Sequence, residues 1–115
     1  MVRSFLLLSP SLLSVGEALT LTPPIHMKTY HIACIPGDGI GQEVVPAGEQ
    51  VLQVLARASQ SFQFKFSHFG WGGDWYRQHG QMMPDNGLDE LRGTDAILFG
   101  SAGDPHIPDH ITLWG

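Results

Sequence analysis

Three stretches of the chain carry the apolar pattern of β-strands. The run 30–35, Tyr-His-Ile-Ala-Cys-Ile, is continuous and β-prone, which predicts a strand buried on both faces of a mostly parallel sheet. Phe62, Phe64 and Phe66 alternate with polar residues, which predicts a second strand with one buried face. The run 96–99 is again apolar throughout and predicts a third strand buried on both faces.

The segments between these strands carry helical patterns. After Gly41, apolar residues recur every three to four positions through Arg57, which predicts an amphipathic helix. Pro46 lies in its second turn, where it removes one backbone hydrogen bond and favours a slight bend. Two short helices are expected further on, one from an N-cap at Asp74 through Gln78 and one over 85–91. The alternation of strands and helices predicts an open α/β sheet in the order β-α-β-α-β.

Glycine-rich loops follow the first and third predicted strands. In the turn 36–41, glycines at three alternate positions suggest a dinucleotide fingerprint, but position 42 is Gln and the second strand ends in Ser67 and His68 without an acidic residue. The sequence also lacks the Gly-Lys-Ser/Thr of a P-loop at this turn. We therefore interpret the turn as a tight strand-to-helix connection, with the Rossmann interpretation as the alternative. Two such loops after parallel strands predict a ligand crevice at the carboxyl ends of the strands.

Composition narrows the class of protein. With six basic and eleven acidic side chains, the formal net charge of -5 weighs against binding to nucleic acid or to an anionic membrane surface. The single cysteine, Cys34, excludes an intramolecular disulfide and is interpreted as a small buried hydrophobe in a reducing compartment. At 115 residues the chain is short for an open sheet covered on both faces, so an incomplete domain is expected.

Two groups of side chains suggest other chemistry and are interpreted more simply. His106 and His110 have the four-residue spacing of a metal pair on a helix, but neighbouring prolines oppose a helix there, so we expect solvated loop histidines. Trp71, Trp75 and Tyr76 could stack on a base; without basic residues around them, packing onto the sheet is the favoured interpretation.

Residues 1–26 differ from the rest of the chain. They are apolar, interrupted by Ser and Pro, and carry only Arg3 and Glu17 as charged residues. A weak signal-peptide pattern competes with a disordered extension or a mis-assigned start ahead of Met27, and we favour the latter. On this interpretation residues 27–115 form the domain and the protein is cytoplasmic; a targeting role for 1–26 would make it organellar or secreted.

The motifs resemble a known family. The stretch 35–44, Ile-Pro-Gly-Asp-Gly-Ile-Gly-Gln-Glu-Val, followed by Phe-Gly-Ser-Ala-Gly at 99–103, resembles the β-decarboxylating dehydrogenases of 2-hydroxy acids, which include isocitrate and isopropylmalate dehydrogenases. Met-Met-Pro-Asp at 82–85 and the run 108–115 look most like the branch of tartrate dehydrogenase/decarboxylase and D-malate dehydrogenase. The resemblance covers about residues 28–115 and implies the N-terminal part of an isopropylmalate dehydrogenase-like open sheet.

The resemblance also implies a chemistry. The family oxidises a small 2-hydroxy acid such as tartrate or D-malate with NAD, often with decarboxylation, and uses Mg²⁺ or Mn²⁺ as a Lewis acid. It implies a homodimer for the full-length enzyme, with no nucleic-acid or membrane partner. The catalytic Tyr and Lys, the metal aspartates and the substrate arginines of the family all lie beyond this chain, so neither catalytic nor metal residues are assigned. The residues that match the family's nicotinamide-side loop are Gly100, Ser101, Ala102, Gly103, Asp104 and Pro105, and Trp114 matches the start of its substrate-recognition helix.

Three hypotheses follow for the chain itself. The first is an N-terminal fragment of such a dehydrogenase, inactive alone. The second is a truncated, non-catalytic product that binds other chains through an unpaired sheet edge. The third, ranked last, is a small phosphate-binding module built on the turn 36–41.

Overall fold

The computed structural model describes residues 27–113. Its elements are the strands β1 (Lys28–Gly37), β2 (Phe62–His68) and β3 (Ala96–Ser101), and the helices α2 (Gly41–Ser59), α3 (Gly73–His79), α4 (Gly87–Arg92) and α5 (Asp109–Thr112). The strands form one parallel sheet in the order β2-β1-β3, with the first strand of the sequence in the middle. The α/β fold class and the three expected strands are thus confirmed.

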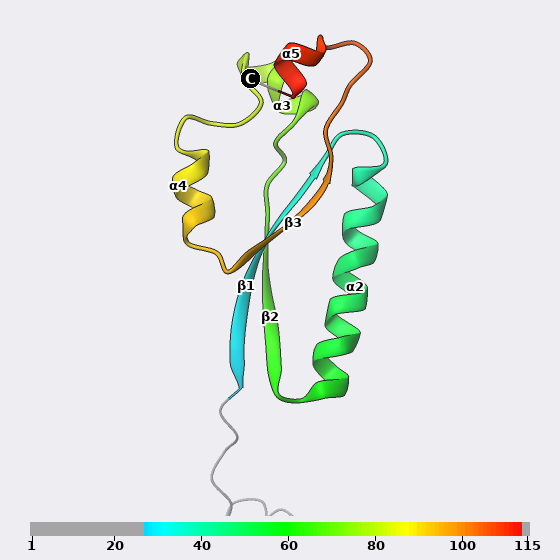
Figure 1. The fold of residues 1–115 in the computed structure, drawn as a ribbon, viewed down its shortest axis with the longest axis vertical. Coiled ribbons are helices and arrows are strands. Elements are labelled where there is room, and N and C mark those ends of the chain that lie inside the picture. Colours follow the sequence, from blue (N-terminus) through cyan, green and yellow to red (C-terminus); the bar gives the residue numbers. More distant parts are fainter. Residues whose placement is uncertain (1–26, 114–115) are drawn as a thin grey trace, which may run out of the picture.

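Helix α2 packs along one face of the sheet, while α3 and α5 lie together near one end of it (Figure 1). Within the sheet, Cys34 is paired with His68 of β2 and with Leu98 of β3. The buried core consists of Ile32 and Cys34 of β1 and Val45 of α2, and Leu98 of β3 packs against it. The core therefore lies between α2 and the sheet, as the amphipathic pattern after Gly41 predicts.

The strand patterns are confirmed for β1 and β2 but not for β3. Ile32 to Ile35 of β1 are buried, and the three phenylalanines of β2 are half-buried while Gln63 and Lys65 are exposed. In β3, however, Ile97 and Phe99 are exposed. These two side chains are on the face away from α2, in a strand that pairs on one side only within the described residues. The expectation of burial on both faces was therefore wrong for β3. An apolar run indicates that a strand is suited to burial, but it does not determine whether another element covers each face.

The helix boundaries differ slightly from those expected. Pro46 lies inside α2 as predicted, and the helix ends at Ser59, followed by the C-cap Gln60 in a left-handed conformation (φ 55°). Helix α3 begins at Gly73, so Asp74 lies in its first turn and is not its N-cap. Gly72 takes the cap position because its φ of 132° is accessible to glycine and not to an aspartate.

No helix among the described residues is long and apolar enough to cross a membrane. Residue 114 and the extension 1–26, on which two sequence-based expectations rest, lie outside the described residues.

Candidate functional site

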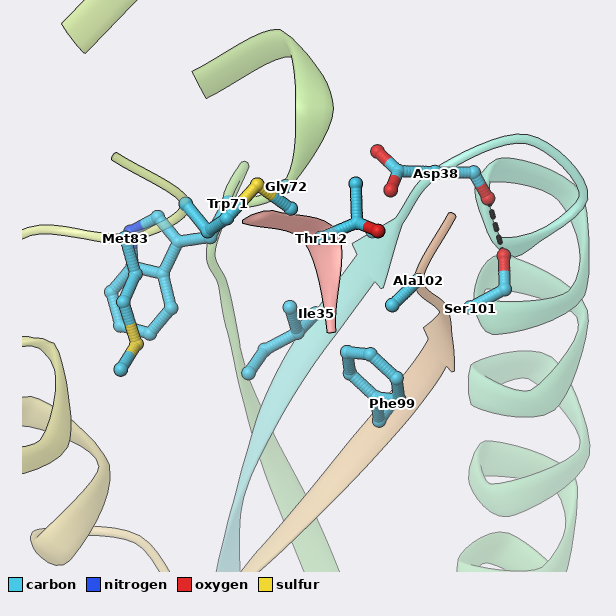
Figure 2. Close-up of a pocket in the computed structure, with 11 residues that line it drawn as sticks. Ile35, Asp38, Trp71, Gly72, Met83, Phe99, Ser101, Ala102 and Thr112 are labelled. Carbon is cyan, nitrogen blue, oxygen red and sulfur yellow. Dashed lines mark hydrogen bonds between the residues drawn. The ribbon is translucent and has the colours of Figure 1, made fainter. Parts of the chain in front are cut away.

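Asp38 holds together three loops at the carboxyl end of the sheet. It follows β1 and is buried. One carboxylate oxygen, Oδ1, accepts a hydrogen bond from the backbone amide of Gly73 at 2.7 Å, and the other, Oδ2, accepts one from the amide of Gly103 at 2.9 Å. The Asp38 backbone is also bonded to Ser101: its amide donates to the Ser101 carbonyl at 2.8 Å, and the Ser101 hydroxyl donates to its carbonyl (Figure 2). One aspartate thus fixes the start of α3 and the loop after β3 relative to β1.

The backbone of the turn 36–41 lies so close to the end of β3 that Gly37 and Gly41 leave no room for a Cβ atom. A Cβ atom on Gly41 would lie 1.8 Å from the carbonyl oxygen of Pro36. A Cβ on Gly37, where φ is 71°, would lie 2.0 Å from the carbonyl oxygen of Ser101. These glycines therefore serve backbone-to-backbone packing, which supports the interpretation of the turn as a tight strand-to-helix connection.

An apolar cavity of about 150 Å³ lies beside this junction. Figure 2 shows Phe99 and Ile35 on adjacent strands below it and Thr112 of α5 above. Ser101 at the end of β3 and Ala102 directly after it also line the cavity. Trp71 and Met83 line it from the loops on either side of α3. The cavity thus occurs at the carboxyl ends of parallel strands, where open α/β sheets bind ligands.

A second, polar hollow lies on the other side of Asp38. It is lined by Gly103, Asp104 and Pro105 of the loop after β3 and by Asp74 and Arg77 of α3. This hollow and the apolar cavity share Gly37 and Asp38 in their linings. The two hollows are therefore adjacent and separated by the Asp38 junction.

Arg77 and Asp104 form the main ion pair of the polar hollow. Arg77 Nη1 donates to Asp104 Oδ2 at 2.6 Å, and Nη2 donates to Asp74 Oδ1 at 2.6 Å. The bond from Arg77, together with one from the backbone amide of His106, lowers the pKa of Asp104. The bonds to Asp104 and then to Asp74 raise the pKa of Arg77. Both groups are thus held in their charged forms, and the pair ties α3 to the loop after β3.

The residues expected on the cofactor side divide between the two hollows. Ser101 and Ala102 line the apolar cavity, and Gly103, Asp104 and Pro105 line the polar hollow. Gly100 lines neither, because it packs against the turn 36–41: a Cβ there would lie 2.2 Å from the Pro36 carbonyl oxygen. Trp114, expected on the substrate side, lies outside the described residues.

Sequence reasoning did not single out Asp38 or Arg77. An aspartate between two glycines is common in exposed turns, so its burial was not visible from the pattern. In the sequence Arg77 resembles any other polar residue of a short helix. Its partner, Asp104, is 27 positions away, so the sequence does not indicate the ion pair.

Trp71 and His106 were interpreted correctly, but the loop expected at His110 was wrong. His110 is exposed but lies in α5, because Pro108 takes the N-cap position, where a proline does not interrupt a helix. Trp71 is buried and packs against Phe69, with ring centroids 4.5 Å apart. Trp75 stacks on His79 of the same helix, so the packing onto the sheet expected of Trp75 and Tyr76 stays a prediction. His106 is exposed in the loop before α5, as expected for a solvated histidine.

The junction and both hollows fall within a region shared with known proteins. Residues 31–112 match the isocitrate/isopropylmalate dehydrogenase family. A probable tartrate dehydrogenase/decarboxylase of Agrobacterium vitis is 55% identical over 89 residues, which cover 77% of this chain and 25% of that protein. The D-malate dehydrogenase [decarboxylating] of Escherichia coli (strain K12) is 50% identical over 91 residues, again 77% of this chain and 25% of that protein.

The fold has a counterpart among solved structures. The apo form of a β-decarboxylating dehydrogenase from Thermococcus kodakarensis superposes with a TM-score of 0.51 and 33% identity, covering 69% of this chain and 22% of that one. The chain spans about a quarter of the length of the curated relatives it matches. Because the family match extends over most of the described residues and includes both glycine loops and the Asp38 junction, the chain belongs to the isocitrate/isopropylmalate dehydrogenase family.

Proposed function

We propose that this chain supplies the nicotinamide side of an NAD-dependent dehydrogenase that oxidises a small 2-hydroxy dicarboxylate such as tartrate or D-malate, with or without decarboxylation. The observation that carries the proposal is the loop after β3, which Asp38 holds at the mouth of an apolar cavity at the carboxyl ends of β1 and β3. The names of the relatives, tartrate dehydrogenase/decarboxylase and D-malate dehydrogenase, support the substrate class.

The residues present fit a nicotinamide group. Phe99, Trp71 and Ile35 offer apolar surface for a flat ring. The adjacent polar hollow is open at Gly103, since nothing lies within 4 Å of a Cβ built there. NAD, when bound, supplies hydride acceptance at its nicotinamide ring. In this proposal Ser101 to Pro105 contact the cofactor and Gly100 holds that loop against the turn 36–41. Trp114 is assigned to the substrate side from the family resemblance alone.

The described residues do not fit the Mg²⁺ or Mn²⁺ of the family. Among residues 27–113, the group of three potential metal ligands is Cys34, Glu49 and His68, and a thiol with an imidazole does not suit these hard cations. We assign the metal and the groups that move protons to the longer protein, and we expect the 115-residue chain alone to be inactive. The boundary at 26/27, the homodimer of the longer enzyme and the cytoplasmic location also stay predictions.

A chimera tests the proposal. The matching first quarter of the E. coli D-malate dehydrogenase is replaced by residues 28–113 of this chain, and oxidation of D-malate and of tartrate by NAD is measured. We expect activity on at least one substrate. In the chimera, Ala102→Glu places a carboxylate where the anionic cofactor binds and is expected to raise KM for NAD at least about tenfold, a cost of about 1.4 kcal/mol.

The matched control is Ala58→Glu, at an exposed position of α2 away from both hollows. It is expected to leave KM for NAD unchanged. A folded chimera that is inactive on both substrates, or equal effects of the two Glu variants, would overturn the proposal.

A second candidate is an interaction role without catalysis. It is favoured by the exposed Ile97 and Phe99 on β3, a strand that pairs on one side only within the described residues. Light scattering of the free chain tests it: assembly that grows with concentration and is lost in Phe99→Ser supports it, and a monomer at all concentrations contradicts it.

A further inference from the structure

A thiol, a carboxylate and an imidazole meet on the α2 side of the sheet. Cys34 of β1, Glu49 of α2 and His68 of β2 each offer one ligand atom, and these three atoms lie within 4.8 Å of one another. His68 Nε2 and Glu49 Oε2 are 2.6 Å apart. The dehydrogenase function proposed above uses none of these side chains.

The three positions are held by the scaffold and not by loops. Cys34 and His68 are partners in the β1–β2 register, so their side chains share the face that α2 covers. Glu49 lies in the middle of α2, about one turn after Val45, which packs in the core with Cys34. Two strands and one helix therefore place the ligand atoms, as a preformed metal site requires.

We propose that Cys34, Glu49 and His68 form a binding site for a borderline divalent cation such as Zn²⁺. Thiolate sulfur, imidazole nitrogen and carboxylate oxygen are the ligand types that Zn²⁺ takes in proteins. Ligands at about 2.0–2.3 Å from a tetrahedral ion lie roughly 3.3–3.8 Å from one another. An ion would therefore replace the 2.6 Å His68–Glu49 hydrogen bond, and small side-chain rotations that separate these two groups bring the three ligand atoms to the required spacing. The thiol of Cys34 gives its proton to solvent when the metal–sulfur bond forms.

Exposure gives the site an entrance and a fourth position. The Cys34 side chain is completely buried, Glu49 is 16% exposed and His68 is 61% exposed. An ion therefore enters from the His68 side and keeps a water there as its fourth ligand. Because its ligands come from β1, α2 and β2, the bound ion links the helix to the two strands beneath it.

The test uses the whole 115-residue chain, reduced and stripped of metal with a chelator. Co²⁺ is titrated as a spectroscopic substitute for Zn²⁺, and Zn²⁺ is then added in competition. We expect one equivalent of Co²⁺ to produce a thiolate-to-cobalt charge-transfer band that Zn²⁺ removes and that a large excess of Mg²⁺ leaves unchanged. Zn²⁺ well above its Kd is expected to raise the thermal midpoint by about 5 °C or more.

Variants locate the site. Removing a residue that only supports a metal ligand lowers metal affinity by about 10–100-fold, and removing the ligand itself lowers it further. His68→Ala and Glu49→Gln are therefore each expected to weaken Co²⁺ binding by at least about 100-fold. His68 is largely exposed, so His68→Ala keeps the fold intact; circular dichroism verifies this. The matched control, His110→Ala, replaces an exposed histidine of α5 and is expected to bind Co²⁺ as the wild-type chain does.

A cobalt spectrum without a thiolate band, or equal affinities for His68→Ala and the wild-type chain, would overturn the proposal. Neither result bears on the NAD site, which is assayed separately in the chimera.

Discussion

Asp38 and Gly103 are joined by a 2.9 Å hydrogen bond although they are 65 residues apart in the sequence. The donor is a backbone amide and the acceptor is a buried carboxylate, so the bond fixes the path of a loop and does not depend on the side chain at position 103. The same carboxylate accepts the amide of Gly73. The arrangement of the candidate site therefore depends strongly on one side chain.

Asp38→Asn is expected to destabilise the chain by about 1–3 kcal/mol. Both oxygens of Asp38 accept from backbone amides, and the amide group of asparagine would present a donor to one of them. Urea unfolding followed by circular dichroism measures the loss. Asp85→Asn, at an exposed position, is the matched control and is expected to change the stability by less than about 0.5 kcal/mol. Equal stabilities of the two variants would show that the Asp38 junction does not hold the loops.

Gly41→Ala is expected to destabilise the chain by about 3 kcal/mol or more. The added Cβ would lie 1.8 Å from the Pro36 carbonyl oxygen and 2.9 Å from the Ser101 amide nitrogen, so the turn and the end of β3 would have to separate. Gly70→Ala serves as the control, because nothing lies within 4 Å of a Cβ built there. Thermal unfolding of both variants checks this. If Gly41→Ala melted at the wild-type temperature, the close packing of the turn against β3 would be wrong.

The ion pair between Arg77 and Asp104 predicts a loss of stability in acid. The pKa of Asp104 is lower in the folded chain than its ordinary value of 3.8. Its contribution is therefore fully present above that value and is lost as the pH falls through the folded-state pKa. Arg77→Gln is expected to flatten the fall of the thermal midpoint between about pH 4 and pH 2.

The control for this pair is Arg92→Gln. Arg92 also pairs with an aspartate, Asp89, but both side chains are more than two-thirds exposed, whereas the Asp104 side chain is 11% exposed. Exposed pairs contribute little, so the acid limb of Arg92→Gln is expected to follow the wild-type curve. Parallel acid limbs for Arg77→Gln and the wild-type chain would count against the role of the Arg77 pair.

Val45→Ala is expected to cost about 2 kcal/mol, because Val45 is 2% exposed and packs with Ile32 and Cys34 in the core. Val51→Ala, in the same helix but 67% exposed, is expected to stay within about 0.5 kcal/mol of the wild-type stability. Urea unfolding of both variants decides whether α2 covers the sheet through the face that contains Val45. A larger loss for Val51→Ala would place the other face of the helix against the strands.

The sequence predicts the elements of this fold better than the environment of each element. Periodicity located the strands and α2, because alternation and three-to-four-residue spacing are local properties of the chain. The exposure of Phe99 could not be predicted in this way, since it depends on what covers β3. The N-cap of α3 was missed because Gly72, with its positive φ, replaces the side-chain cap that Asp74 seemed to offer.

The sequence predicted the loop of the candidate site, but not the side chains that hold this loop in place. The resemblance pointed to residues 100–105, and the structure shows that Asp38 and Arg77 hold parts of this loop. Both interactions join residues far apart in the sequence, and a single sequence carries no signal for such pairs. The Cys34, Glu49 and His68 group escaped prediction for the same reason, since its members come from three elements.

The central place of β1 has a consequence for how the chain folds during synthesis. β1 leaves the ribosome first, yet both of its edges pair with strands made later, and the partner at its second edge ends at Ser101. Until then β1 has one open edge, and the Asp38 carboxylate lacks the Gly103 amide as a donor. Closing so long a loop is slow, so we expect late, non-local formation of the sheet and a nascent chain that depends on chaperones until residue 103 has emerged.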